Sequence, residues 1–90
     1  MKTIYKFPLQ VTEQQIVSLP KNATIVSVHN QFGHSDIFMW VLLDEADPFN
    51  VPRKILMFGT GWEANVEEDQ FLGTVMVGPY VWHYFDGGEL

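Results

Sequence analysis

The segment Asp36–Asp44 constrains the fold more than any other part of this chain, because it places seven consecutive apolar residues between two aspartates. The run is too short to cross a membrane as a helix, which takes about 20 residues. Read as a strand, it directs apolar side chains to both faces of a sheet, with Ile37, Met39, Val41 and Leu43 on one face and Phe38, Trp40 and Leu42 on the other. Both faces of such a strand must pack against other parts of a protein, so the strand needs two covers. In a chain of 90 residues, this pattern favours a neighbouring subunit as the second cover.

Length and composition indicate one folded unit. We expect a single domain over residues 1–90, and a content of 47% apolar and 14% aromatic residues is typical of a chain with a real core. The absence of cysteine excludes disulfides, thiolate metal ligands and a thiol nucleophile. The opening Met1–Pro8 lacks the apolar stretch of a signal peptide, so we expect a cytoplasmic location.

The formal charge of −6, from eleven carboxylates against five Lys and Arg, argues against general nucleic-acid binding, because it repels a phosphate backbone. No feature predicts membrane binding. The acids concentrate in two clusters, Asp44–Asp47 and Glu63–Asp69. Each cluster is interpreted either as a solvated loop that keeps the protein soluble or as an acidic surface that meets a basic partner.

Turn signals divide the chain into short runs rich in β-branched and aromatic residues, and no window shows a sustained helical period. The expected strands are Lys2–Phe7, Gln14–Leu19, Thr24–Asn30, Asp36–Leu43, Arg53–Phe58, Phe71–Val77 and Tyr80–Phe85. The sequence therefore predicts an all-β fold, a small antiparallel sandwich or partly open barrel of about seven short strands. We expect hairpins over Phe71–Phe85 and over Lys2–Leu19.

The last expected strand resembles Asp36–Asp44 in being apolar on both faces. Tyr80, Trp82 and Tyr84 share one face, and Val81, His83 and Phe85 share the other. Both faces are core, or one of them belongs to an interface, where large amphipathic rings are common. We favour a homo-oligomer, and the expected interface residues are Phe38, Trp40, Tyr80, Trp82 and Tyr84.

Candidates for catalysis and metal binding are few. The histidines His29, His34 and His83 lie far apart, with no spacing typical of metal ligands. No serine sits in a Gly-x-Ser-x-Gly elbow. We therefore expect no enzymatic activity, no metal and no cofactor.

The segment Phe58–Trp62 is the part of the sequence most suited to a ligand. Its two glycines let the backbone approach a bound group, and Trp62 offers a ring for stacking a base. Two cations, Arg53 and Lys54, begin the strand that leads into it. The expected ligand-binding residues are Arg53, Lys54, Gly59, Thr60, Gly61 and Trp62. The alternative is a tight turn after a strand, with Trp62 folded onto the core.

Seven segments, taken in order, resemble a widespread family of small phage proteins of unknown function. They are Met1–Thr12, Leu19-Pro20, Ile25–Val28, Trp40–Asp44, Phe58–Gly61, Phe71–Val75 and Val81–Phe85, and they cover nearly the whole chain. The resemblance implies a viral origin and an accessory role in the host cytoplasm, and it transfers no catalytic residue. The chain departs from the family pattern at the aromatic segment Phe32–Phe38 and at Glu63–Asp69.

Two classes of function follow as hypotheses. The first is a non-enzymatic binder that sequesters a small nucleotide-type signal of host defence, with a pocket formed by the Gly59–Trp62 segment and the aromatic strands. The second is an acidic inhibitor or virion-associated protein that binds a host or phage protein through its acidic loops.

Overall fold

Seven strands and one short 3₁₀ helix make up the computed structural model, which describes residues 1–31 and 36–90. In chain order they are β1 (Lys2–Leu9), β2 (Gln14–Leu19), β3 (Thr24–Asn30), β4 (Ile37–Asp44), β5 (Val51–Gly59), η1 (Glu68–Gln70), β6 (Phe71–Val77) and β7 (Tyr80–Glu89). Each strand overlaps one that the sequence predicts, and all of their pairings are antiparallel. The first four residues of the aromatic segment Phe32–Phe38, among them His34, lie outside the described residues.

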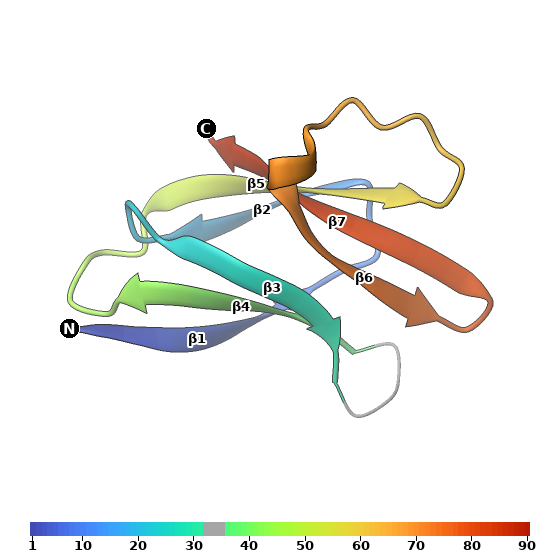
Figure 1. Cartoon of the computed structure of the whole chain (residues 1–90). Coiled ribbons are helices and arrows are strands. Elements are labelled where there is room, and N and C mark those ends of the chain that lie inside the picture. Colours follow the sequence, from blue (N-terminus) through green and yellow to red (C-terminus); the bar gives the residue numbers. More distant parts are fainter. Residues whose placement is uncertain (32–35) are drawn as a thin grey trace.

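The strands form two facing sheets rather than one closed ring, so the sandwich is the predicted architecture that the structure confirms. One sheet has the order β1-β4-β3, and the other has the order β2-β5-β7-β6. The two sheets approach each other most closely where β3 lies beside β6 (Figure 1). There the Met76 backbone N–H donates a hydrogen bond to Asn30 Oδ1 at 3.0 Å. A Cβ on Gly73 would run into the Val28 carbonyl, so only glycine permits this approach.

Of the two predicted hairpins, one is confirmed and one is wrong. Strands β6 and β7 pair through a tight turn at Gly78, whose φ of +58° suits glycine. The hairpin predicted over Lys2–Leu19 does not form, because β1 pairs with β4 and β2 pairs with β5. Gln15 stabilises the crossing between the sheets by bonding both backbone groups of Gln10 with its side-chain amide, at 3.1 and 2.9 Å.

The core lies between the two sheets and draws side chains from both. On β4, the first face predicted from alternation is fully buried, with Ile37, Met39, Val41 and Leu43 at most 2% exposed. The opposite face of β4 is only half-buried. Strands β3, β5, β6 and β7 contribute Val28, Ile55, Met57, Val75 and Tyr84 to the central packing, and β1 and β2 add Leu9 and Leu19. The one-faced burial of β4 leaves its other face as outer surface.

Several strands extend beyond their predicted ends, β7 by the most residues. Strand β5 begins at Val51 rather than Arg53, and β7 continues past Phe85 to Glu89. The extension of β7 pairs Gly88 with Lys54 across a bulge. Gly87 lies so close to the Lys54 backbone that a Cβ would be 3.0 Å from its carbonyl oxygen. Gly87 and Gly88, which look like a turn signal in the sequence, therefore allow β7 to pair closely with β5.

Candidate functional site

The turn after β5 folds Trp62 back over Gly59. The Trp62 backbone N–H donates to the Gly59 carbonyl at 3.1 Å, and Gly61 takes a φ of +88° that favours glycine. A Cβ on Gly59 would come within 2.8 Å of Cε2 and 2.9 Å of Nε1 of the Trp62 ring. The missing side chain of Gly59 thus makes room for an indole ring that is still 47% exposed.

Beside this turn lies a hollow of about 400 Å³, called the aromatic hollow below. Its lining residues are Gly59, Thr60, Trp62, Pro79, Tyr80, Val81 and Trp82. The Tyr80 and Trp82 rings stack, with centroids 5.7 Å apart and planes at 16°. The Trp62 ring meets Trp82 edge-on, at 5.6 Å and 69°. Three rings, one from the turn after β5 and two from the beginning of β7, therefore converge on one hollow.

Strand register explains why these rings meet. Trp82 pairs with Gly59 on β5 and with Val75 on β6, which places its ring on the inner face of the four-stranded sheet. Trp82 packs against the core, and its indole N–H is buried without a hydrogen-bond partner among the described residues. Tyr80 is 60% exposed at the beginning of β7. The hollow thus has one anchored ring and two accessible ones.

A threonine–histidine–threonine chain fixes the rim of the hollow. Thr60 Oγ1 is 2.7 Å from Nε2 of His83, and Thr74 Oγ1 is 2.9 Å from Nδ1 of the same ring. In a neutral imidazole one nitrogen donates and the other accepts, so one hydroxyl accepts from the ring and the other donates to it. The Gly59–Trp62 turn is thereby tied to β7 and β6.

Arg53 and Lys54 were predicted to join this site, and the structure places both elsewhere. Arg53 lies six residues before Gly59 on an extended strand, a separation of about 20 Å. Its guanidinium is buried, where it donates to Asp86 Oδ2 and to the Ala23 carbonyl, both at 2.8 Å. The Lys54 side chain packs beside Gly87, on the opposite face of the sheet from Arg53. The prediction grouped residues that are close in sequence but separated along the strand.

The predicted interface residues divide among three places. Tyr84 is fully buried, donates its hydroxyl to the Gln10 carbonyl at 2.9 Å and has its pKa raised by burial to about 12, so it belongs to the core and not to an interface. Tyr80 and Trp82 line the aromatic hollow. Phe38 and Trp40 lie on the outer face of the three-stranded sheet, with Lys6 Nζ 4.4 and 5.8 Å from their ring centres. The sequence predicts a pocket that includes the aromatic strands but assigns Tyr80 and Trp82 to an interface, because only the register of β7 against β5 shows that these two rings reach the hollow.

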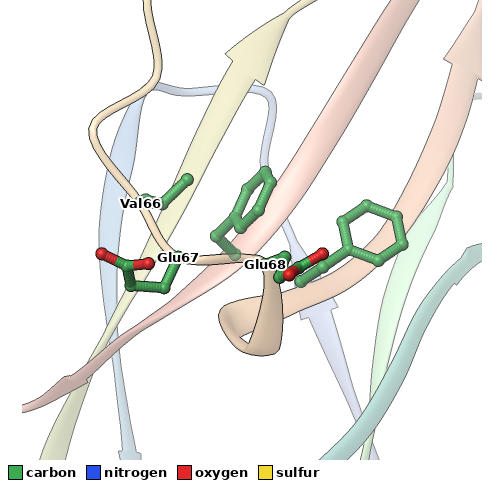
Figure 2. Close-up of a pocket in the computed structure, with 5 residues that line it drawn as sticks. Val66, Glu67 and Glu68 are labelled. Carbon is green, nitrogen blue, oxygen red and sulfur yellow. The ribbon is translucent and has the colours of Figure 1, made fainter.

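A second hollow, of about 500 Å³, lies under the loop that leads into η1. Figure 2 shows Val66, Glu67 and Glu68 along its edge; Phe71 and Phe85 complete the lining. The Phe85 ring makes edge contacts with Phe71 at 5.4 Å and with Phe58 at 5.7 Å. This Phe85 hollow therefore combines an aromatic floor with two exposed carboxylates.

Neither hollow has the composition of a metal centre. Within residues 1–31 and 36–90, no three His, Cys, Asp or Glu side chains gather closely enough to hold a metal ion. In the same part of the chain, no helix has the length and apolarity needed to cross a membrane. The polar side chains in the lining of the aromatic hollow are the Thr60 hydroxyl, the Tyr80 phenol and the two indoles.

Comparison with known proteins gives a family but no activity. No curated protein and no solved structure matches the chain. The family described as "Domain of unknown function (DUF7352)" matches residues 1–89, which is nearly the whole chain. The predicted resemblance to a family of unknown function is confirmed to that extent, while the match carries no source and so does not bear on a phage origin. The chain belongs to the DUF7352 family of domains of unknown function.

Proposed function

We propose that this protein binds a small planar ligand, such as a nucleobase, in the aromatic hollow. The observation that carries the proposal is the convergence of Trp62, Tyr80 and Trp82 on one hollow, two of them with exposed rings. Its volume of about 400 Å³ lies within the range of small-molecule sites. A ring stacked on an exposed indole gains about 1–3 kcal/mol.

The lining residues also indicate which part of a ligand the hollow binds. It contains no Lys or Arg, and Arg53 is engaged by Asp86 at the far end of β5. A nucleotide is therefore held by its base, while its phosphate contributes little. The lining offers no carboxylate and no histidine as a general base, which supports binding rather than catalysis.

The biological setting belongs to the same proposal. The resemblance to small phage proteins supports an accessory protein that acts in the host cytoplasm and sequesters a nucleotide-type signal of host defence. Sequestration needs only binding, and the hollow supplies the groups for it.

Calorimetry against nucleosides, mononucleotides and cyclic dinucleotides tests the proposal. Trp62→Ala should weaken binding about tenfold or more, the loss expected from one stacked base, without lowering the melting temperature. Removing the ligand's phosphate should change affinity far less than that. Trp40→Ala, on the outer face of the other sheet, serves as the matched control and should bind as wild type does.

Two results contradict the proposal. One is the absence of binding to every member of the panel. The other is a Trp62→Ala variant with wild-type affinity, which would place any bound ligand outside the aromatic hollow.

A further inference from the structure

The outer face of the three-stranded sheet is apolar along β4, carries both apolar residues and lysines on β1, and is mostly polar along β3. Because alternate residues of β4 fill the core, the cross-strand pairs Ile4–Leu42, Lys6–Trp40 and Pro8–Phe38 lie on the outside. Ile4 is 60% exposed, although β-strand isoleucines usually pack inside. The face that these pairs form together with Lys2 is called the lysine face.

The outer face of the four-stranded sheet is also apolar but carries acids. Ile55, Met57 and Tyr84 point into the core, so their neighbours on β5 and β7 point outward. The outward side of this sheet, with the rim of the Phe85 hollow, includes the apolar residues Ile16, Leu56, Phe58, Phe71 and Phe85, the acids Glu67 and Glu68, and the cation Lys54. This set is called the acidic face. Ile16 and Phe71 are 55% and 48% exposed.

The two faces have opposite charge. On the lysine face, the Lys6 ammonium lies over the rings of Phe38 and Trp40. Asp44, the acid opposite Lys2, is 3.3 Å from the ammonium of Met1. On the acidic face, Glu67 and Glu68 border the Phe85 hollow. Lys54 is a cation on this side, with its stem against Gly87.

We propose that the lysine face of one copy docks on the acidic face of a second copy, in a head-to-tail arrangement. In such an arrangement, other copies of the same chain bury both apolar faces. A foreign basic protein would bury only the acidic face. A symmetric pairing of either face with itself brings like charges together, so the contact joins two different surfaces. This contact is independent of the ligand proposed for the aromatic hollow.

The small size of the faces limits the apolar area that the association can bury. Three strands of seven to eight residues present a surface on the order of 350–400 Å². That is about half of the ~800 Å² that each partner contributes to a standard interface. The association is therefore weak and depends on concentration, and its head-to-tail geometry produces a ring or an open chain of copies.

Sedimentation of the full chain from about 10 μM to about 1 mM tests the docking, because this range covers weak association that depends on concentration. The average mass should rise with concentration. Trp40→Ser with Ile4→Ser removes the apolar part of the lysine face, and Phe71→Ser removes an exposed ring of the acidic face. Each variant alone should associate at least about tenfold more weakly, the loss typical of an aromatic hot spot.

Mixing the two variants separates head-to-tail docking from symmetric docking. One intact lysine face and one intact acidic face remain in the mixture, so a 1:1 complex should form and grow no further. A symmetric contact gives no such rescue, and a mixture that stays monomeric overturns the proposal.

Reversing charges on the two faces gives a second test, which substitutes only exposed side chains. Lys2→Glu with Lys6→Glu should weaken self-association, as should Glu67→Lys with Glu68→Lys, while the chain carrying all four changes should recover it. Circular dichroism verifies that each variant is folded. Two results contradict the docking: a wild-type chain that remains monomeric at every concentration, and a variant with all four substitutions that does not recover self-association. A monomer that captures a basic protein assigns the acidic face to a foreign partner instead.

Discussion

At the scale of single residues, burial decides which polar groups serve the fold. Arg53 is a buried cation whose guanidinium joins β5 to Asp86 on β7 and to the carbonyl of Ala23. Tyr84 is a buried phenol bonded to Gln10 on the crossing between the sheets. Neither is placed to meet a ligand or a partner, although their residue types suggested both roles.

Removing the carboxylate of Asp86 should destabilise the protein substantially. The loss of one partner from a fully buried ion pair costs about 3–5 kcal/mol, and we expect roughly 2–3 kcal/mol for Asp86→Ala because the Asp86 side chain is 26% exposed. Urea unfolding measures this change. Asp69→Ala, an exposed acid outside this pair, should stay within about 0.5 kcal/mol of wild type. Equal stability of the two variants would show that the Arg53 pair contributes nothing.

The raised pKa of Tyr84 makes stability depend on alkaline pH. The folded pKa is about 12 against a model value of 10.0, so between these values the folded chain holds a proton that the unfolded chain has lost. Stability due to this phenol is therefore complete below pH 10 and falls as the pH rises toward 12, by roughly 2–3 kcal/mol.

Urea unfolding of wild type and Tyr84→Phe across this range isolates the effect of the phenol. The difference in unfolding free energy between the two chains should shift in favour of Tyr84→Phe as the pH rises. Tyr80→Phe, which alters an exposed phenol, is the control and should follow wild type. Parallel curves for Tyr84→Phe and wild type would contradict the predicted shift.

At the scale of elements, close approaches of backbone decide how the strands are arranged. The contact of β3 with β6 depends on Gly73, and the fold of the turn after β5 over its own strand depends on Gly59. Each glycine faces a different obstacle. Gly73 lies against the Val28 backbone, while Gly59 lies against the Trp62 side chain, which can move.

This difference predicts losses of stability of different size for two alanine variants. Gly73→Ala should push β3 away from β6 and cost several kcal/mol, because backbone cannot yield as a side chain can. Gly59→Ala should displace the Trp62 ring, with a smaller loss of stability and a change in the aromatic hollow. Thermal unfolding, combined with Trp fluorescence, separates the two outcomes. Similar melting temperatures for both variants would contradict this prediction.

At the scale of the whole molecule, two sheets are assembled from strands that are distant in sequence. Strand β1 pairs with β4, and β2 pairs with β5, so neither pairing is local. Both sheets share one core, which leaves two apolar outer faces on a molecule with extents of 40 × 30 × 18 Å. The outer side of β4 is therefore only half-buried within one molecule. In our proposal, a second copy packs against it.

Non-local pairing predicts slow folding. Chains whose contacts join distant segments fold in milliseconds to seconds, because loop closure must precede the stabilising contacts. Stopped-flow Trp fluorescence after dilution from urea, at a concentration below self-association, should show a main phase in that range. A main phase in microseconds would indicate that the β6–β7 hairpin or another local unit folds by itself.

The sequence by itself determined the approximate positions of the strands and the division of the β4 side chains between two faces, because alternation and turn residues act within a few neighbouring positions; which of the two faces is buried was decided by the tertiary structure. The sequence likewise predicted the β6–β7 hairpin from its tight turn. Tertiary structure alone decided that β1 and β2 lie in different sheets, that Arg53 pairs with Asp86, and that Trp62 meets Tyr80 and Trp82. These outcomes depend on register between distant strands, and a shift of one residue in register would turn every side chain to the other face.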